Sequence, residues 1–167
     1  MITTEYLQML ARYNRWQNES LYAAADGLSD EARRENRGAF FRSIHETLCH
    51  ILWADKIWLS RFTDYPAPVG GIPSSTALHI DWALLCKDRR ETTDAILDWA
   101  ASVTDDQLKG DLSWYSGAIG RDVSRPKWVL FTHFFNHQTH HRGQVHAMLT
   151  GAGAKPDDTD IPFMPGL

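Results

Sequence analysis

The sequence predicts an all-α protein: a four-helix bundle with a small β-hairpin before its last long helix. Four stretches repeat apolar residues at the three- and four-residue spacing of amphipathic helices. One connection between them, residues 64–75, is rich in proline and glycine and too short to join two domains. The length of 167 residues suits one core, so we interpret residues 1–167 as a single bundle domain.

The first helix is expected to begin at a cap formed by Thr3 or Thr4, whose hydroxyl can accept a hydrogen bond from the first turn. Gly27 ends this helix. Its inward positions follow the helical spacing and are Leu7, Leu10, Ala11, Asn14, Leu21 and Ala25. A polar connection, residues 29–40, leads to the second helix.

The second helix is marked by a capping box, Ser43 followed three residues later by Glu46, and is predicted to reach about Phe62. Its apolar stripe consists of Ile44, Leu48, Ile51, Leu52, Leu59 and Phe62. His50 lies on the shoulder of this stripe, and His45 lies on the polar side. Because a bundle helix contacts two neighbours, a shoulder residue can face the space where a ligand site is built.

The third helix is predicted at residues 76–102, where apolar residues return in phase. The segment before it, residues 64–75, cannot continue a helix and is expected to form a loop over one end of the bundle. Residues 113–124 combine aromatic residues, glycines and alternation, which indicates the β-hairpin.

The fourth helix is expected to start at Ser124 and Pro126 and to end near Gly151. The tail that follows is too rich in proline and aspartate for a fifth helix. We expect it to pack across an end of the bundle through Ile161, Phe163 and Met164.

Composition excludes several classes of function. The net charge is −4 and the lysines and arginines are scattered, which argues against a nucleic-acid surface. Thr3, Thr4 and Glu5 rule out a signal peptide at the start, and no apolar run approaches the roughly 18 residues of a membrane span. A cytoplasmic protein is therefore expected. Cys49 and Cys86 lie within helical patterns, so we expect buried, reduced thiols.

Five of the eight histidines lie on the predicted fourth helix. At about 100° per residue, His137 and His141 fall one turn apart on the inward face, whereas His140 and His146 project away from it. His133, one turn earlier, is ambiguous. Two imidazoles at i and i+4 suit a divalent metal, but each of them can equally be a hydrogen-bonded core residue.

The sequence strongly resembles the DinB family along nearly its whole length. The resemblance is carried by YNRWQNESLYAAADGLSD from Tyr13, SIHETLCHILWADKIWLSRF from Ser43, NHQTHHRGQVHAMLTGAG from Asn136 and TDIPFM from Thr159. It implies a four-helix bundle, often dimeric, in which one histidine of the second helix and two of the fourth bind a divalent metal. Carried over to this sequence, these ligands are His50, His137 and His141.

Three nitrogen ligands without a fourth protein ligand leave a coordination position for water or substrate, as in catalytic sites. Zinc and nickel both suit imidazole. The resemblance thus implies a metal-dependent enzyme, a transferase or isomerase that uses low-molecular-weight thiols or else a hydrolase. The alternative is a metal-binding or stress-associated protein without turnover. A homodimer is expected, and a di-iron centre is disfavoured because paired Glu-x-x-His elements are missing.

Three further positions near these histidines, Glu46, Arg142 and Gln144, allow two interpretations each, and Gly143 allows one. Glu46 either acts as a general base or supports a metal ligand through a hydrogen bond, or it serves only as a capping residue. Arg142 and Gln144 either serve the site, with Gln144 orienting a ligand ring, or are a surface arginine and a packing glutamine. Gly143 is costly in mid-helix, which suggests the close approach of a neighbouring helix.

Overall fold

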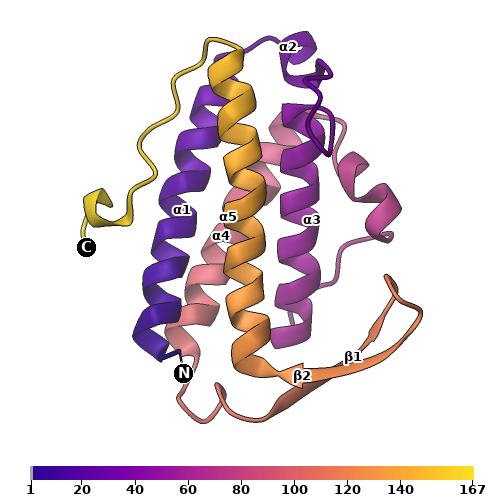
Figure 1. The fold of residues 1–167 in the computed structure, drawn as a ribbon, viewed down its shortest axis with the longest axis vertical. Coiled ribbons are helices and arrows are strands. Elements are labelled where there is room, and N and C mark those ends of the chain that lie inside the picture. Colours follow the sequence, from indigo (N-terminus) through magenta and orange to yellow (C-terminus); the bar gives the residue numbers. More distant parts are fainter. Residues whose placement is uncertain (1) are drawn as a thin grey trace.

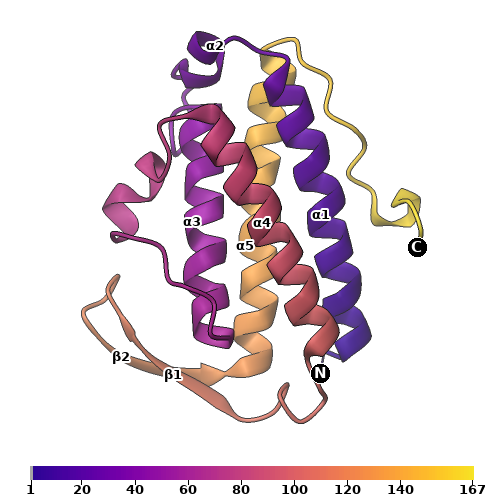
Figure 2. The same cartoon turned by 180° about the vertical axis from the view of Figure 1, so that it is seen from behind.

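The computed structural model describes residues 2–167 and confirms the predicted helical bundle with a two-stranded hairpin before the last long helix (Figure 1). The long helices are α1 (Thr4–Asp26), α3 (Ile44–Phe62), α4 (Trp82–Ser102) and α5 (Lys127–Gly151). Both α4 and α5 pack against α1 and also against α3, so α1 and α3 occupy opposite corners. Figure 2 shows the face where α4 lies between α1 and α3.

The starts of α1 and α3 agree with the caps expected from the sequence. The Thr3 hydroxyl accepts a hydrogen bond from the Tyr6 N–H, and Ser43 accepts one from the Glu46 N–H. The third helix begins at Trp82 and not at residue 76, because Asp81 caps it. The residues before it form a 3₁₀ turn, η1 (Ile72–Ala77).

The polar connection between α1 and α3 contains a short helix that sequence patterns missed, α2 (Asp30–Arg34). Ser29 caps it by accepting from the Ala32 N–H. Arg33 is buried, donates to the carbonyl oxygens of Ala25 and Leu28, and lies over the Trp82 ring. This helix therefore closes the end of the bundle where α1 stops.

A polar layer separates two apolar clusters in the core. The Asp55 carboxylate accepts from Arg89 at 2.6 Å and from the Gln138 amide at 2.8 Å. Arg142 donates to the Asn14 side chain. Arg142 is buried, so the interpretation as a surface arginine is wrong, because its neighbours supply acceptors inside the bundle.

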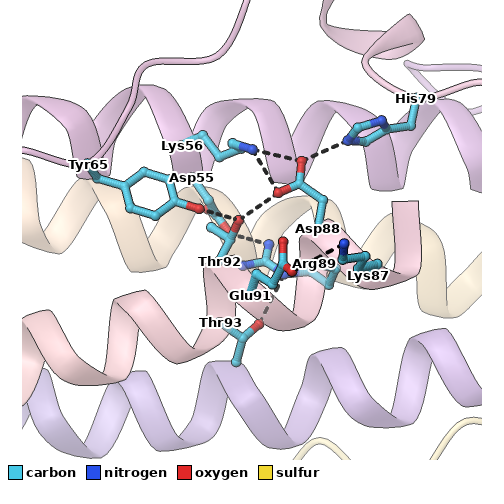
Figure 3. Close-up of polar contacts among 10 residues, drawn as sticks. All are labelled: Asp55, Lys56, Tyr65, His79, Lys87, Asp88, Arg89, Glu91, Thr92 and Thr93. Carbon is cyan, nitrogen blue, oxygen red and sulfur yellow. Dashed lines mark hydrogen bonds and ion pairs between the residues drawn. The ribbon is translucent and has the colours of Figure 1, made fainter. Parts of the chain in front are cut away.

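The crossover, residues 63–81, runs along the flank of α3 and not over an end, contrary to the sequence-based expectation (Figures 1 and 2). Figure 3 shows the hydrogen bonds that attach the crossover to the bundle. The Asp88 carboxylate on α4 accepts one from His79 of the crossover and one from Lys56 on α3, each at 2.7 Å. The Tyr65 hydroxyl lies 3.1 Å from that of Thr92. Three elements therefore meet at Asp88.

The crossover also buries His45, which the sequence placed on the polar side of its helix. The Nε2 of His45 lies 2.7 Å from the carbonyl oxygen of His79. That expectation is wrong because helical phase describes one helix at a time, whereas a covering segment changes which face is exposed.

The hairpin pairs β1 (Asp111–Ser116) with β2 (Arg121–Pro126) in an antiparallel register that sets Trp114 opposite Val123. Ser124 belongs to β2, so α5 begins after Pro126 and not at Ser124. The hairpin extends from the base of α5 toward the end of α3 (Figure 1). Its Trp114 ring packs edge-on against Trp58 of α3.

The tail runs along α1 and does not pack across an end (Figure 1). The Tyr13 hydroxyl and the Gln17 amide donate to backbone carbonyl oxygens of residues 159 and 158. These backbone bonds fix its course. Met164 is buried as expected, whereas Phe163 in η2 (Ile161–Phe163) is 69% exposed.

Gly143 is exposed, and a Cβ at this position would meet no atom within 4 Å. The expected close approach of another helix is therefore wrong. Within residues 2–167, no helix is both long enough and apolar enough to cross a membrane.

Candidate metal centre

Three histidines from two helices converge between α3 and α5. His50 comes from α3, and His137 and His141 lie one turn apart on α5. One ring nitrogen from each lies within 4.8 Å of the other two. The Nε2 atoms of His50 and His137 are only 3.3 Å apart. The structure therefore brings together the three side chains that the sequence nominated as ligands.

The site is partly covered by an aromatic ring that sequence analysis did not nominate. Phe41 lies with its ring centre 3.9 Å from that of His50 and 5.2 Å from that of His141. It is held by a tight turn in which Ala39 pairs with Arg42, and Arg42 has a φ of 64°. His50 and His141 are only 6% and 7% exposed and His137 is half-buried, so two of the three rings have little contact with bulk water.

The crossover fixes the tautomer of His50. Ser75 is fully buried in η1 and donates its hydroxyl proton to the Ile72 carbonyl oxygen at 2.7 Å. The Ser75 oxygen is then left to accept from His50 Nδ1–H, at 2.8 Å. With the proton on Nδ1, the His50 Nε2 lone pair faces the cluster. This arrangement is the one that orients metal-ligating imidazoles.

Gln144 does the same for His141, as one of the two sequence interpretations proposed. Its Oε1 accepts from His141 Nδ1–H at 2.9 Å, which leaves the Nε2 lone pair free. The Gln144 amide nitrogen lies 3.3 Å from Nε2 of His140, so that outward histidine holds the amide in the required orientation. Arg142 instead belongs to the polar layer of the core.

The donor set fits a divalent metal. A tetrahedral zinc ion with nitrogen ligands at about 2.0–2.1 Å sets those ligands about 3.3 Å apart. This matches the 3.3 Å between the Nε2 atoms of His50 and His137. Because His50 carries its proton on Nδ1, two nitrogens this close need either a proton from His137 or a cation between them. Neutral imidazoles of this kind suit zinc and nickel.

Burial keeps these rings neutral. It lowers the pKa of His50 to about 4 and that of His137 to about 3, and in both cases neighbouring histidines add to the effect. Burial also lowers the pKa of His141, although the hydrogen bond that His141 donates to Gln144 acts in the opposite direction. A neutral ring is the form that binds a metal, so the site is ready to bind metal near neutral pH.

The other candidates lie outside the cluster. His133 is exposed and packs edge-on against Trp58, so its ambiguous phase is resolved in favour of a position beside the site. His140 is exposed and His146 half-buried, in line with their outward phase. Glu46 receives a hydrogen bond from the Ser43 hydroxyl at 2.9 Å and serves as a capping residue. These four side chains are not part of the group within 4.8 Å.

Comparison with known proteins decides the family. The DinB family model matches residues 1–166. The chain belongs to the DinB family. It is 25% identical over 169 residues to Protein DinB of Bacillus subtilis (strain 168). This match covers 94% of this chain and 92% of that protein. A crystal structure of a DinB-like protein from Bacillus cereus ATCC 10987 has the same fold, with a TM-score of 0.58 and 22% sequence identity. The match covers 86% of this chain and 91% of that one.

Ser75→Ala is expected to weaken metal binding by about 10- to 100-fold in this DinB-family protein, because His50 loses the acceptor that fixes its tautomer. Zinc titration of the chelator-treated protein measures this. Ser74→Ala is the matched control, since Ser74 is exposed and its hydroxyl only donates to Gly71. Equal affinities for the two variants would contradict the role given to Ser75.

Folding stability without metal should fall as pH decreases from about 6.5 toward 4. The unfolded chain takes up protons on its histidines near pH 6.5, whereas folded His50 and His137 stay neutral down to about pH 4 and 3. The unfolded state thus binds more protons across this window, and the fold loses stability. Urea unfolding at several pH values measures the slope, which His137→Gln should reduce. An unchanged slope in that variant would argue against a neutral buried ring.

Proposed function

We propose that this protein is a divalent-metal-dependent enzyme of the DinB family that acts on a small molecule. The observation that supports this most directly is the convergence of three neutral imidazoles from His50, His137 and His141. No cysteine, aspartate, glutamate or further histidine among residues 2–167 joins this group. A three-nitrogen set without a fourth protein ligand is typical of catalytic metal sites and not of structural ones.

A divalent ion bound by three imidazoles supplies a Lewis acid with a position left for a water molecule or a thiol. The chain's own residues hold the rings in place. Ser75 and Gln144 keep the protons of His50 and His141 on Nδ1, away from the cluster. Phe41 covers two of the rings and excludes water from that side.

The protein offers no activated thiol of its own. Burial raises the pKa of Cys49 to about 11, and its Sγ contacts the carbonyl oxygen of His79 at 3.4 Å. Burial also raises the pKa of Cys86 to about 11. A thiol at that pKa is inert as a nucleophile near neutral pH. A thiol-dependent reaction would therefore use a low-molecular-weight thiol as cosubstrate, and a hydrolytic one would use water.

The test is a screen of protein loaded with zinc, nickel or manganese. One arm pairs low-molecular-weight thiols with electrophilic acceptors, and the other offers simple esters and amides. Metal-dependent turnover that His141→Ala abolishes would support the enzyme. Full metal occupancy without turnover in either arm would favour the alternative, a metal-binding or stress-associated protein. The low exposure of His50 and His141 is the observation that favours this alternative.

We also propose that the protein is a homodimer. Large apolar side chains remain exposed, and three of them, Val69, Ile72 and Ile80, belong to the crossover. A second copy would remove such surface from water. Light scattering at micromolar concentrations should give twice the mass of the 19.0 kDa chain. A monomer mass at every concentration would refute the dimer.

A further inference from the structure

Arg61, in the last turn of α3, lies against two tryptophans that are themselves in contact. Its guanidinium carbon lies 4.4 Å from the ring centre of Trp58 and 5.5 Å from that of Trp114. The two indoles also contact each other edge-on, with ring centres 5.5 Å apart. Since Trp114 comes from β1, the hairpin brings the second ring to this arginine.

No acidic side chain in the described part of the chain, residues 2–167, lies within ion-pair distance of Arg61, and its guanidinium donates to no protein acceptor there. Other buried arginines behave differently, since Arg33, Arg89 and Arg142 each donate to an oxygen of the protein. Burial lowers the pKa of Arg61 without a carboxylate to oppose it. This cation is thus half-buried without a counterion.

The two indoles leave the donors of Arg61 available. Indole rings attract the cation through their π-faces and accept no conventional hydrogen bond from it, and the five N–H groups of a guanidinium point outward in its plane. The planar edge matches the two oxygens of a carboxylate or phosphate. Because the tryptophans also remove water from the guanidinium, such a pair would be stronger here than on an open surface.

A continuous row of rings joins Arg61 to the metal centre. The ring centre of Trp58 lies 5.2 Å from that of His133, and His133 lies 5.7 Å from His137. Burial, and after it the charge of Arg61, lowers the pKa of His133. Arg61 follows His50 by eleven residues on the same helix, about 16 Å along its axis.

We propose that Arg61, held by Trp58 and Trp114, is an anion subsite that binds the carboxylate or phosphate group of an elongated small substrate whose reactive end lies at the three histidines. The link to the substrate rests on the proposed function. The subsite itself depends only on the arginine and its two tryptophans.

The test is a titration of purified, chelator-treated protein, in which no metal competes for the anion. Benzoate, phenyl phosphate and benzamide are the probes, and tryptophan fluorescence is the signal, because two indoles contact Arg61. We expect saturable binding of the anions and at least about tenfold weaker binding of the neutral amide. A preference for benzoate or for phenyl phosphate then identifies the class of anion.

Arg61→Met should weaken anion binding by at least about tenfold. Arg61→Lys keeps the charge but loses the planar fork, so it should fall between Met and wild type. Arg12→Met is the matched control, since Arg12 is an exposed arginine on α1, and it should bind like wild type. The thermal midpoint of each variant shows that it is folded.

The subsite would be overturned by no anion binding in wild type, by equal binding of benzamide, or by equal losses in Arg61→Met and Arg12→Met. Binding that appears only after zinc is restored and survives Arg61→Met would place the anion on the metal, and would also overturn it. Failure of the turnover screen with intact anion binding would reject the proposed enzyme and leave the subsite standing.

Discussion

Asp55→Ala is expected to destabilise the protein by about 3–5 kcal/mol, the cost of leaving a buried charge without its partner. Asp55 is 1% exposed, and its two oxygens accept from Arg89 at 2.6 Å and from Gln138 at 2.8 Å. Without the carboxylate, the buried Arg89 side chain loses its ion pair. Chemical denaturation measures the change in unfolding free energy.

Asp94→Ala provides the matched control. Asp94 forms an ion pair with Arg15, but the two side chains are 65% and 44% exposed. Exposed pairs contribute less than about 1 kcal/mol, so this variant should unfold close to wild type. Similar losses from the two variants would mean that the Asp55 pair is no more important than a surface contact.

His137→Ala should lower metal affinity by at least on the order of a hundredfold. A complete four-ligand zinc site contributes about 10–16 kcal/mol, so one imidazole among three accounts for several kcal/mol. His50→Ala and His141→Ala should have effects of the same order, since each supplies one ring nitrogen to the cluster. Competition with a chromophoric chelator measures these affinities.

His133→Ala is the control for the ligand set, because His133 lies next to His137 but outside the cluster. It should retain wild-type affinity. If His133→Ala removes the metal while His50→Ala leaves it bound, the ligand assignment is wrong.

Much of this arrangement could be predicted from local sequence. Caps at Thr3 and Ser43 set two helix starts, and both are where the structure has them. Helical phase alone directed His137 and His141 inward. Phase could not separate His133 from them, because the angle between successive turns is small and the neighbouring helix decides which rings meet.

The contacts made by the crossover could not be predicted, because they join residues far apart in the sequence. The bond between Ser75 and His50 depends on η1 packing against α3, which no periodic pattern encodes. The same segment buries His45. The burial of Arg142 could not be predicted for a related reason, because its hydrogen-bond acceptor, Asn14, lies near the other end of the sequence.

We expect His50, His137 and His141 to bind one divalent metal together. Anomalous scattering from crystals of the metal-loaded protein, collected at the absorption edge of zinc or nickel, would locate the ion. One peak per chain should lie about 2.0–2.2 Å from a ring nitrogen of each of the three histidines. A metal-loaded crystal whose peak lies at His133 or His140, or that has no peak between these three rings, would contradict it.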